Sequence, residues 1–123
     1  MERVQVIEYK GKAIIYLDFS RCGKDELIQV IEAGSAIIRK CPPASALTLS
    51  NFTGFMFTFN MVDLLKEFTL QNKPYVKAAA VIGVTGLRKI PYEAIMKITK
   101  RNLPSFDTQV EAMEYLVNYQ ETS

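Results

Sequence analysis

The spacing of hydrophobic positions changes repeatedly along the chain, and these changes predict strands and helices in turn. The stretch 76–84 is apolar at nearly every position, including an unbroken run from Ala78 to Ile82. A strand with one side in water carries polar residues at every second position, so both faces of this strand should be covered. We expect it to lie centrally in a parallel sheet, with the rest of the chain packed around it.

The N-terminal part of the chain predicts a hairpin. Two runs rich in β-branched and aromatic residues, 4–9 and 13–19, are joined by Lys10 and Gly11, and two residues are enough to connect antiparallel strands. In the second run apolar side chains fall on both alternating faces, so both faces should be covered. Two shorter strands are expected at 44–50 and 103–106.

Four segments with apolar residues at helical spacing follow these strands. The first begins after Gly23 and stops at Pro42, and the second begins with Asn60 as its cap. The third follows the turn at residues 83–86, with Thr85 as its cap. The fourth begins with a capping box formed by Thr108 and a glutamate three residues later.

Proline and glycine predict two local features within the helices. Pro91 falls too late in the third helix to be a harmless first-turn residue if that helix starts at Gly86, so a kink or a restart near Ile90 is expected. Gly34 weakens the first helix locally, which is accepted more readily where a neighbouring element approaches closely. We treat Gly34 as a packing feature.

The order of these elements defines the fold class. Strand, strand, helix, strand, helix, strand, helix, strand, helix predicts an α/β domain with a mixed, mostly parallel sheet of about five strands, an N-terminal antiparallel hairpin and four helices. At 123 residues and 49% apolar composition, the chain 1–123 should form one domain. A chain of this length buries roughly two thirds of its unfolded surface, which needs no metal or disulfide.

Charge and cysteine usage exclude several classes of function. The 15 basic and 13 acidic residues are spread along the chain, so nucleic acid is not expected as a partner. No stretch approaches the apolar length of a membrane span, and the N-terminus lacks a secretory signal, so a cytoplasmic protein is expected. Cys22 and Cys41 flank a helix that holds them about 25 Å apart, so they should be free thiols.

The chain contains no histidine, which removes the commonest metal ligand and the commonest general base. No cofactor or metal is expected. Asp18, near the exit of a buried strand, either pairs with a backbone amide or helix start, or belongs to a ligand pocket. An enzyme that uses Asp18 or Cys22 remains an alternative, although neither has an activating partner visible in the sequence.

The segment 52–59 holds four phenylalanines and a methionine between a strand and a helix. These rings either cover one end of the core, or line an apolar pocket, or form a contact patch. In an extended segment, strict alternation would direct Phe55, Phe57 and Phe59 to one side. We therefore consider them as a binding or self-association surface.

The carboxyl ends of the parallel strands are the expected site region. The candidate binding residues there are Asp18, Asn51, Thr53, Thr58, Gly83, Thr85 and Gly86. The glycines either allow a tight turn or form a phosphate loop, although the full glycine fingerprint is missing. Two helix N-termini at this edge would favour an anion, with threonine hydroxyls as added donors, whereas the Asp18 carboxylate would work against it.

A family resemblance is carried by residues 16–20, 47–49, 66–68, 72–78 and 83–87. Over its whole length the chain resembles the STAS domain of anti-sigma-factor antagonists, in the SpoIIAA-like branch whose fold is also similar to CRAL-TRIO lipid-binding domains. The resemblance implies a non-enzymatic module that binds a protein partner or a small ligand. It also implies a phosphorylated residue at the start of the second helix, where only Thr58, or less closely Thr53, matches.

These observations together predict a regulatory protein-binding module. The alternative is a carrier or sensor of a small apolar or anionic, lipid-like ligand, with the phenylalanine segment as its wall. A homodimer is possible, and no integral membrane segment is expected.

Overall fold

The computed structural model describes residues 2–86 and 89–120. Its elements in chain order are β1 (Val4–Tyr9), β2 (Lys12–Asp18), α1 (Lys24–Ile38), β3 (Ala46–Asn51), α2 (Phe59–Asn72), the short 3-10 helix η1 (Lys73–Tyr75), β4 (Val76–Ile82), α3 (Lys89–Thr99), β5 (Ser105–Phe106) and α4 (Gln109–Asn118). The sheet order is β1-β2-β3-β4-β5, with β1 and β2 antiparallel and the other pairs parallel. The predicted α/β class is confirmed.

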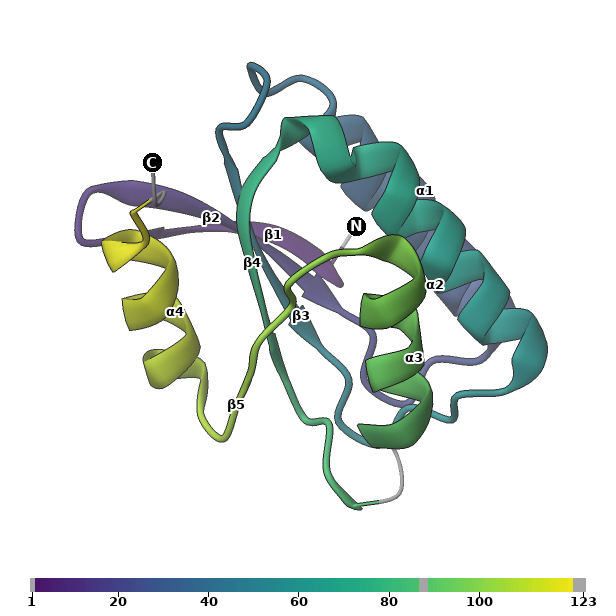
Figure 1. Ribbon diagram of the computed structural model, residues 1–123. Helices are drawn as coiled ribbons and strands as arrows, with labels where there is room; N and C mark the ends of the chain where they lie inside the picture. Colours follow the sequence, from purple (N-terminus) through teal and green to yellow (C-terminus); the bar gives the residue numbers. More distant parts are fainter. Residues whose placement is uncertain (1, 87–88, 121–123) are drawn as a thin grey trace.

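The molecule has three layers. Figure 1 shows α1, α2 and α3 on one side of the sheet and α4 on the other. In β2, Ile15 and Leu17 pack into the cluster under α1 to α3, while Ile14 packs into the cluster under α4. Both faces of β2 are therefore covered, as its apolar pattern predicted.

The hairpin turn is set by two residues. Lys10 and Gly11 have φ angles of 50° and 80°, and positive φ at both central positions is the turn geometry whose twist matches antiparallel strands. The predicted antiparallel start of the sheet is confirmed.

Strand β4 has a neighbouring strand on each side, as predicted, but the central strand of the five is β3. Residues Ala78 to Ile82 of β4 are buried, as the run of apolar positions predicted. Strand β5 pairs only with Val81 and Ile82. Within the part of the chain that the structure describes, the outer edge of β4 before Val81 therefore has no strand beside it.

Two helix starts can be compared with their predicted caps. Helix α4 begins after Thr108, whose Oγ1 accepts the Glu111 N–H at 3.2 Å, so Thr108 is confirmed as the cap. Glu111 Oε1 accepts from the Thr108 hydroxyl at 2.9 Å rather than from its backbone N–H, so the predicted pair interacts without the backbone bond of a capping box. Helix α2 begins after Thr58, whose Oγ1 accepts the Met61 N–H at 3.4 Å. The prediction of Asn60 as the cap of α2 was therefore wrong.

Helix α3 is described from Lys89 onward, so Pro91 lies in its first turn. The first four N–H groups of a helix have no partner within the helix, so the missing N–H of proline costs little there. Where the helix begins depends on residues 87 and 88, which the structure does not describe, so the expected kink or restart near Ile90 stays a prediction. The predicted cap at Thr85 depends on residues 87 and 88, which lie outside the described residues.

Gly34 is a point of close approach between α1 and β2. A Cβ added at Gly34 would come within 2.7 Å of Leu17 Cδ2, and the Leu17 side chain is itself buried. Overpacking of this kind costs about 1–3 kcal/mol. The interpretation of Gly34 as a packing feature is confirmed.

We expect Gly34→Ala to lower the free energy of unfolding by about 1 kcal/mol or more, because the clash with Leu17 outweighs the better helix propensity of alanine. Denaturant unfolding monitored by circular dichroism measures this change. The control is Ala36→Gly at an exposed position of α1, which measures the propensity term alone and should cost about 1 kcal/mol. A gain in stability from Gly34→Ala equal to the loss in the control would contradict the packing role.

Both cysteines are free, with Cys22 buried and Cys41 half-buried, and burial raises the pKa of the Cys22 thiol. Titration of the unfolded, unreduced protein should find two thiols. In the native protein at neutral pH, Cys41 should react first with a thiol reagent, because the thiolate is the reactive form and Cys22 is both shielded and harder to ionise. Cys22→Ser and Cys41→Ser assign the two phases, and a faster Cys22 would contradict this order.

Candidate functional site

The carboxyl ends of β2, β3 and β4 bring most of the predicted site residues together. Asp18 ends β2 beside Asn51 of β3, and Asn51 pairs in turn with Ile82 of β4. Gly83 then touches the loop after β3: a Cβ at Gly83 would lie 2.4 Å from the Thr53 nitrogen, and its φ is +86°. Glycine is therefore required at this position by space and by backbone conformation. Thr85 and Gly86 follow in the next turn and are exposed.

Asp18 is used to hold its own loop. Its Oδ1 accepts the Ser20 N–H at 2.9 Å, and Arg3 Nη1 lies 3.9 Å from the same oxygen. Arg3 also donates to the carbonyl oxygens of Asp18 and Ser20 and to Glu26 Oε2, at 3.2, 2.8 and 3.0 Å. Asp18 was predicted either to pair with a backbone amide or to belong to a ligand pocket, and the structure shows the pairing with a backbone amide.

Asn51, Thr53 and Thr58 likewise have partners within the chain. Asn51 Nδ2 donates to Tyr16 Oη at 3.0 Å, and Asn51 Oδ1 accepts from the Thr53 N–H and Oγ1 at 3.0 and 2.7 Å. The Thr58 hydroxyl oxygen caps α2. The hydroxyls expected to bind an anion therefore stabilise loops in this arrangement, and anion binding at this edge stays a prediction.

The phenylalanine segment is not extended, and the proposed common surface of Phe55, Phe57 and Phe59 was wrong. The Phe55 N–H donates to the Phe52 carbonyl oxygen at 3.0 Å, and Gly54 between them has φ +70°, so the chain turns there. Phe55 is fully buried, Phe57 is half-buried, and Phe59 is 93% exposed.

The buried rings form one aromatic cluster with Phe19. Phe52 stacks on Phe19 with ring centroids 4.9 Å apart, and Phe57 contacts Phe55 edge to face at 4.8 Å. Such contacts are favourable beyond the area they bury. This part of the segment covers one end of the core, while Phe59 and the 69% exposed Met56 remain on its surface.

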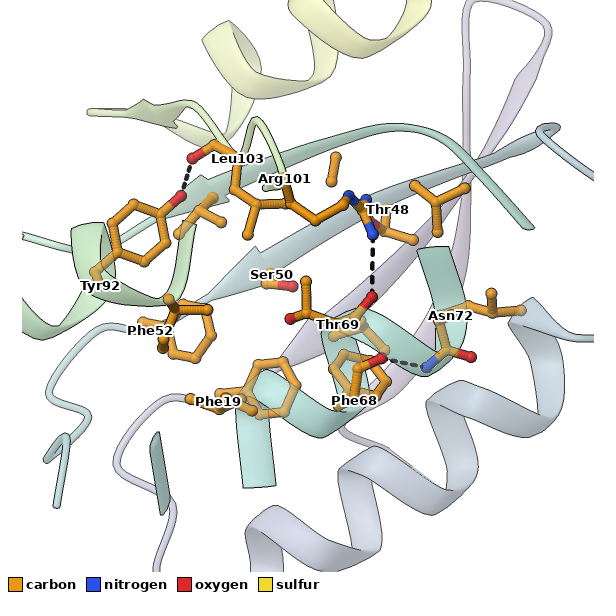
Figure 2. A pocket seen from close by; sticks show the side chains of 17 residues that line it. Phe19, Thr48, Ser50, Phe52, Phe68, Thr69, Asn72, Tyr92, Arg101 and Leu103 are labelled. Atoms are coloured by element: carbon orange, nitrogen blue, oxygen red, sulfur yellow. Dashed lines mark hydrogen bonds between the residues drawn. The ribbon is translucent and has the colours of Figure 1, made fainter. Parts of the chain in front are cut away.

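A cavity of about 60 Å³ lies between the sheet and α2 and α3, and none of the predicted site residues is among its lining residues. Figure 2 shows its lining, which is largely apolar. Its polar members are Thr48, Ser50, Thr69, Asn72 and Arg101. The signal in the sequence was the alternation on β3, where Thr48 and Ser50 replace large apolar residues on one face, next to the small Ala79 of β4. Small side chains on two adjacent strands leave space that a helix cannot fill.

Two polar side chains of this cavity are incompletely paired. Arg101 is half-buried, its Nη1 donates to the Thr69 carbonyl oxygen at 3.2 Å, and burial lowers the pKa of its guanidinium. Asn72 is 2% exposed and its Nδ2 donates to Ser35 Oγ and the Phe68 carbonyl oxygen, at 3.1 and 2.9 Å. Its Oδ1 is buried, and the described part of the chain supplies no hydrogen-bond partner for it.

Tyr92 closes the α3 side of the cavity. Its hydroxyl donates to the Leu103 carbonyl oxygen, and burial raises the pKa of this tyrosine well above its ordinary value. Tyr92 therefore stays protonated and ties α3 to the segment that leads into β5.

Residues 2–86 and 89–120 contain no cluster of three cysteine, aspartate or glutamate side chains arranged to hold a metal. No helix within the same ranges has the length and hydrophobicity needed to cross a membrane.

Comparisons with known proteins find a likeness in structure. No protein-family model matches the chain, and neither does any curated protein sequence. Among solved structures, the chain is similar to an anti-sigma-factor antagonist (STAS) domain protein from Planctomyces limnophilus, with a TM-score of 0.59 and 19% identity. The match covers 94% of this chain and 98% of that one.

Sequence identity this low establishes the fold and nothing finer. The further likeness to CRAL-TRIO domains stays a prediction. The chain has the fold of a STAS domain protein, with a five-stranded mixed sheet and four helices.

Proposed function

We propose that this protein is a non-enzymatic regulatory module that acts by binding another protein through the loop between β3 and α2 together with Phe59, the first residue of α2. The similarity in fold to an anti-sigma-factor antagonist domain protein supports a regulatory role. The binding surface is assigned from the side chains that this loop presents to solvent.

The observation that carries the proposal is the exposure of Phe59 and Met56, at 93% and 69%. Burying a phenylalanine is worth about 1.5–3 kcal/mol, and the same loop buries Phe52 and Phe55 fully or nearly so. Single exposed apolar residues are common, but two large ones three positions apart in a loop that buries its other rings favour a contact surface.

The chemistry around this loop favours binding over catalysis. Asp18, Asn51 and Thr58 hold the loops together through hydrogen bonds within the chain. The polar groups at this edge are therefore engaged in structure, and the groups offered to a partner are apolar.

Arg21 gives the surface a charged rim. Its backbone N–H donates to the Thr53 carbonyl oxygen at 3.0 Å, and its side chain passes so close to Gly54 that a Cβ there would meet Arg21 Cγ at 2.8 Å. Apolar anchors beside an arginine are typical of protein interfaces. The fitting partner is a protein with an apolar pocket and an acidic residue at its edge.

Phosphorylation of Thr58, which the family resemblance implies, would place a phosphate at the N-terminus of α2 and directly before Phe59. A helix N-terminus favours a phosphate, so the modification would alter this surface without unfolding it. It stays a prediction.

We expect Phe59→Ser to raise the Kd for the partner by about tenfold or more, because the buried area of one phenylalanine is lost. A photo-cross-linking amino acid at position 59 in the native cells identifies the partner, and calorimetry with the purified pair measures the Kd. The control is Val110→Ser, which removes a 57% exposed apolar side chain from α4 and should leave the Kd within about twofold.

Two results would count against the proposal. One is a purified partner that binds Phe59→Ser as tightly as the unchanged protein. The other is cross-linking from position 59 only to a second copy of this chain, which would make the loop a homodimer contact.

A further inference from the structure

The cavity between the sheet and the helices has walls that suit an apolar chain. Leu17, Phe52, Leu65 and Ile95, from β2, the loop after β3, α2 and α3, are among its lining residues. One water needs roughly 10–15 Å³ of such space, so a cavity of about 60 Å³ holds roughly four to six non-hydrogen atoms. This size fits a short chain and excludes a long acyl chain in the present conformation.

Arg101 supplies a cation at the side of this cavity. A guanidinium has five N–H donors, and the side-chain hydrogen bond found for Arg101 is the one to the Thr69 carbonyl oxygen. Figure 2 shows the side chain reaching past the cavity toward Thr69. In residues 2–86 and 89–120, no carboxylate lies within 4.0 Å of it. A desolvated charge without a counter-charge favours an anionic ligand.

A second, open hollow of about 250 Å³ adjoins the cavity, and the two share Val76, Ala79 and Arg101. Its other lining residues are Lys73, Lys77, Ala78, Lys100, Asn102, Tyr115 and Tyr119. No acidic side chain belongs to this lining. The hollow follows the edge of β4 that β5 leaves without a partner strand. It therefore offers a positive approach to Arg101 and room for an anionic head.

Asn72 is a second polar side chain in the lining whose hydrogen bonding is incomplete. Within residues 2–86 and 89–120, no partner is found for its buried Oδ1. Buried acceptors are nearly always paired. A bound water would supply the missing donor.

We propose that this cavity binds a small amphiphilic anion, with a short apolar chain between β3, β4 and α2 and its carboxylate or phosphate paired with Arg101 at the basic hollow. This site shares Phe52 with the loop after β3, but Met56 and Phe59 are not among its lining residues. If the cavity binds no such anion, the proposed protein contact at Phe59 can still be correct. If the protein contact is wrong, the cavity can still bind the anion.

Hexanoate is the probe for this site, measured by NMR titration of the backbone amides. Saturable shifts are expected in β3, β4 and α2. 1-Hexanol, which lacks the charge, and acetate and inorganic phosphate, which lack the chain, should each bind about tenfold more weakly or worse. Hexyl phosphate distinguishes the two kinds of head: tighter binding than hexanoate assigns a phosphate ligand, and weaker binding assigns a carboxylate.

Arg101→Met tests the head contact. Hexanoate should bind about tenfold more weakly to this variant, while the Kd for 1-hexanol stays within about twofold, which also shows that the cavity is still formed. The matched control is Lys100→Met, which removes a neighbouring charge from the hollow but not from the cavity lining and should change the hexanoate Kd by less than about threefold.

Ala79→Leu tests the contact with the apolar chain of the ligand and leaves Arg101 unchanged. It also provides the test if the Arg101→Met variant does not fold. A leucine at this position on β4 occupies the cavity, so hexanoate binding should fall by about tenfold or more. The proposal is overturned if hexanoate shows no saturable shift, if acetate or 1-hexanol binds as tightly as hexanoate, or if neither Arg101→Met nor Ala79→Leu weakens hexanoate binding.

Discussion

Both faces of β3 and β4 are buried, and this need for cover on two sides decides where every helix lies. Leu47 and Leu49 of β3 pack with Leu116 of α4, while Ala79 and Val81 of β4 face the cluster under α1, α2 and α3. A single helix layer would leave one of these faces in water. The parallel crossovers satisfy the constraint by placing three helices on one side, and the C-terminal helix then covers the other (Figure 1).

The same strands explain why the inner face is imperfectly filled. Thr48 and Ser50 of β3 and Ala79 of β4 are small, so the sheet surface under α2 and α3 is hollow where these residues meet. Arg101 and Asn72 border this space with unused hydrogen-bonding capacity. A void with unpaired polar groups is unfavourable in a dense interior, and a bound ligand would remove that cost.

The features that could be predicted from the sequence depend on neighbours in the chain. The turn at Lys10 and Gly11 and the helix cap at Thr108 were found because both use short-range hydrogen bonds and backbone preferences. The prediction of Asn60 as the cap failed because Thr58, two residues earlier, is an equally good cap, and its hydroxyl oxygen accepts the Met61 N–H. The regular alternation of rings failed because Gly54 allows a turn that buries Phe55.

The cavity was missed for the opposite reason: the small residues Thr48 and Ser50 on one face of β3 were its one local sign, and the rest of its lining comes from segments far apart in the chain. Leu17 and Leu103 lie at its walls, and no spacing in the sequence connects them. Arg101 follows Lys97 and Lys100 in the sequence, and its separation from carboxylates depends on tertiary packing. The predicted site residues at the strand ends do lie together, but the pairing of their polar groups was visible only in three dimensions.

A crystal structure grown with 5-bromopentanoate would test the account most directly. Bromine is close in size to the terminal methyl group of hexanoate, and its anomalous signal locates the chain end without ambiguity. The account predicts bromine inside the cavity, among Phe52, Leu65 and Ile95, with the carboxylate within hydrogen-bond distance of Arg101. Bromine in the solvent-filled hollow, or a carboxylate bound away from Arg101, would contradict it.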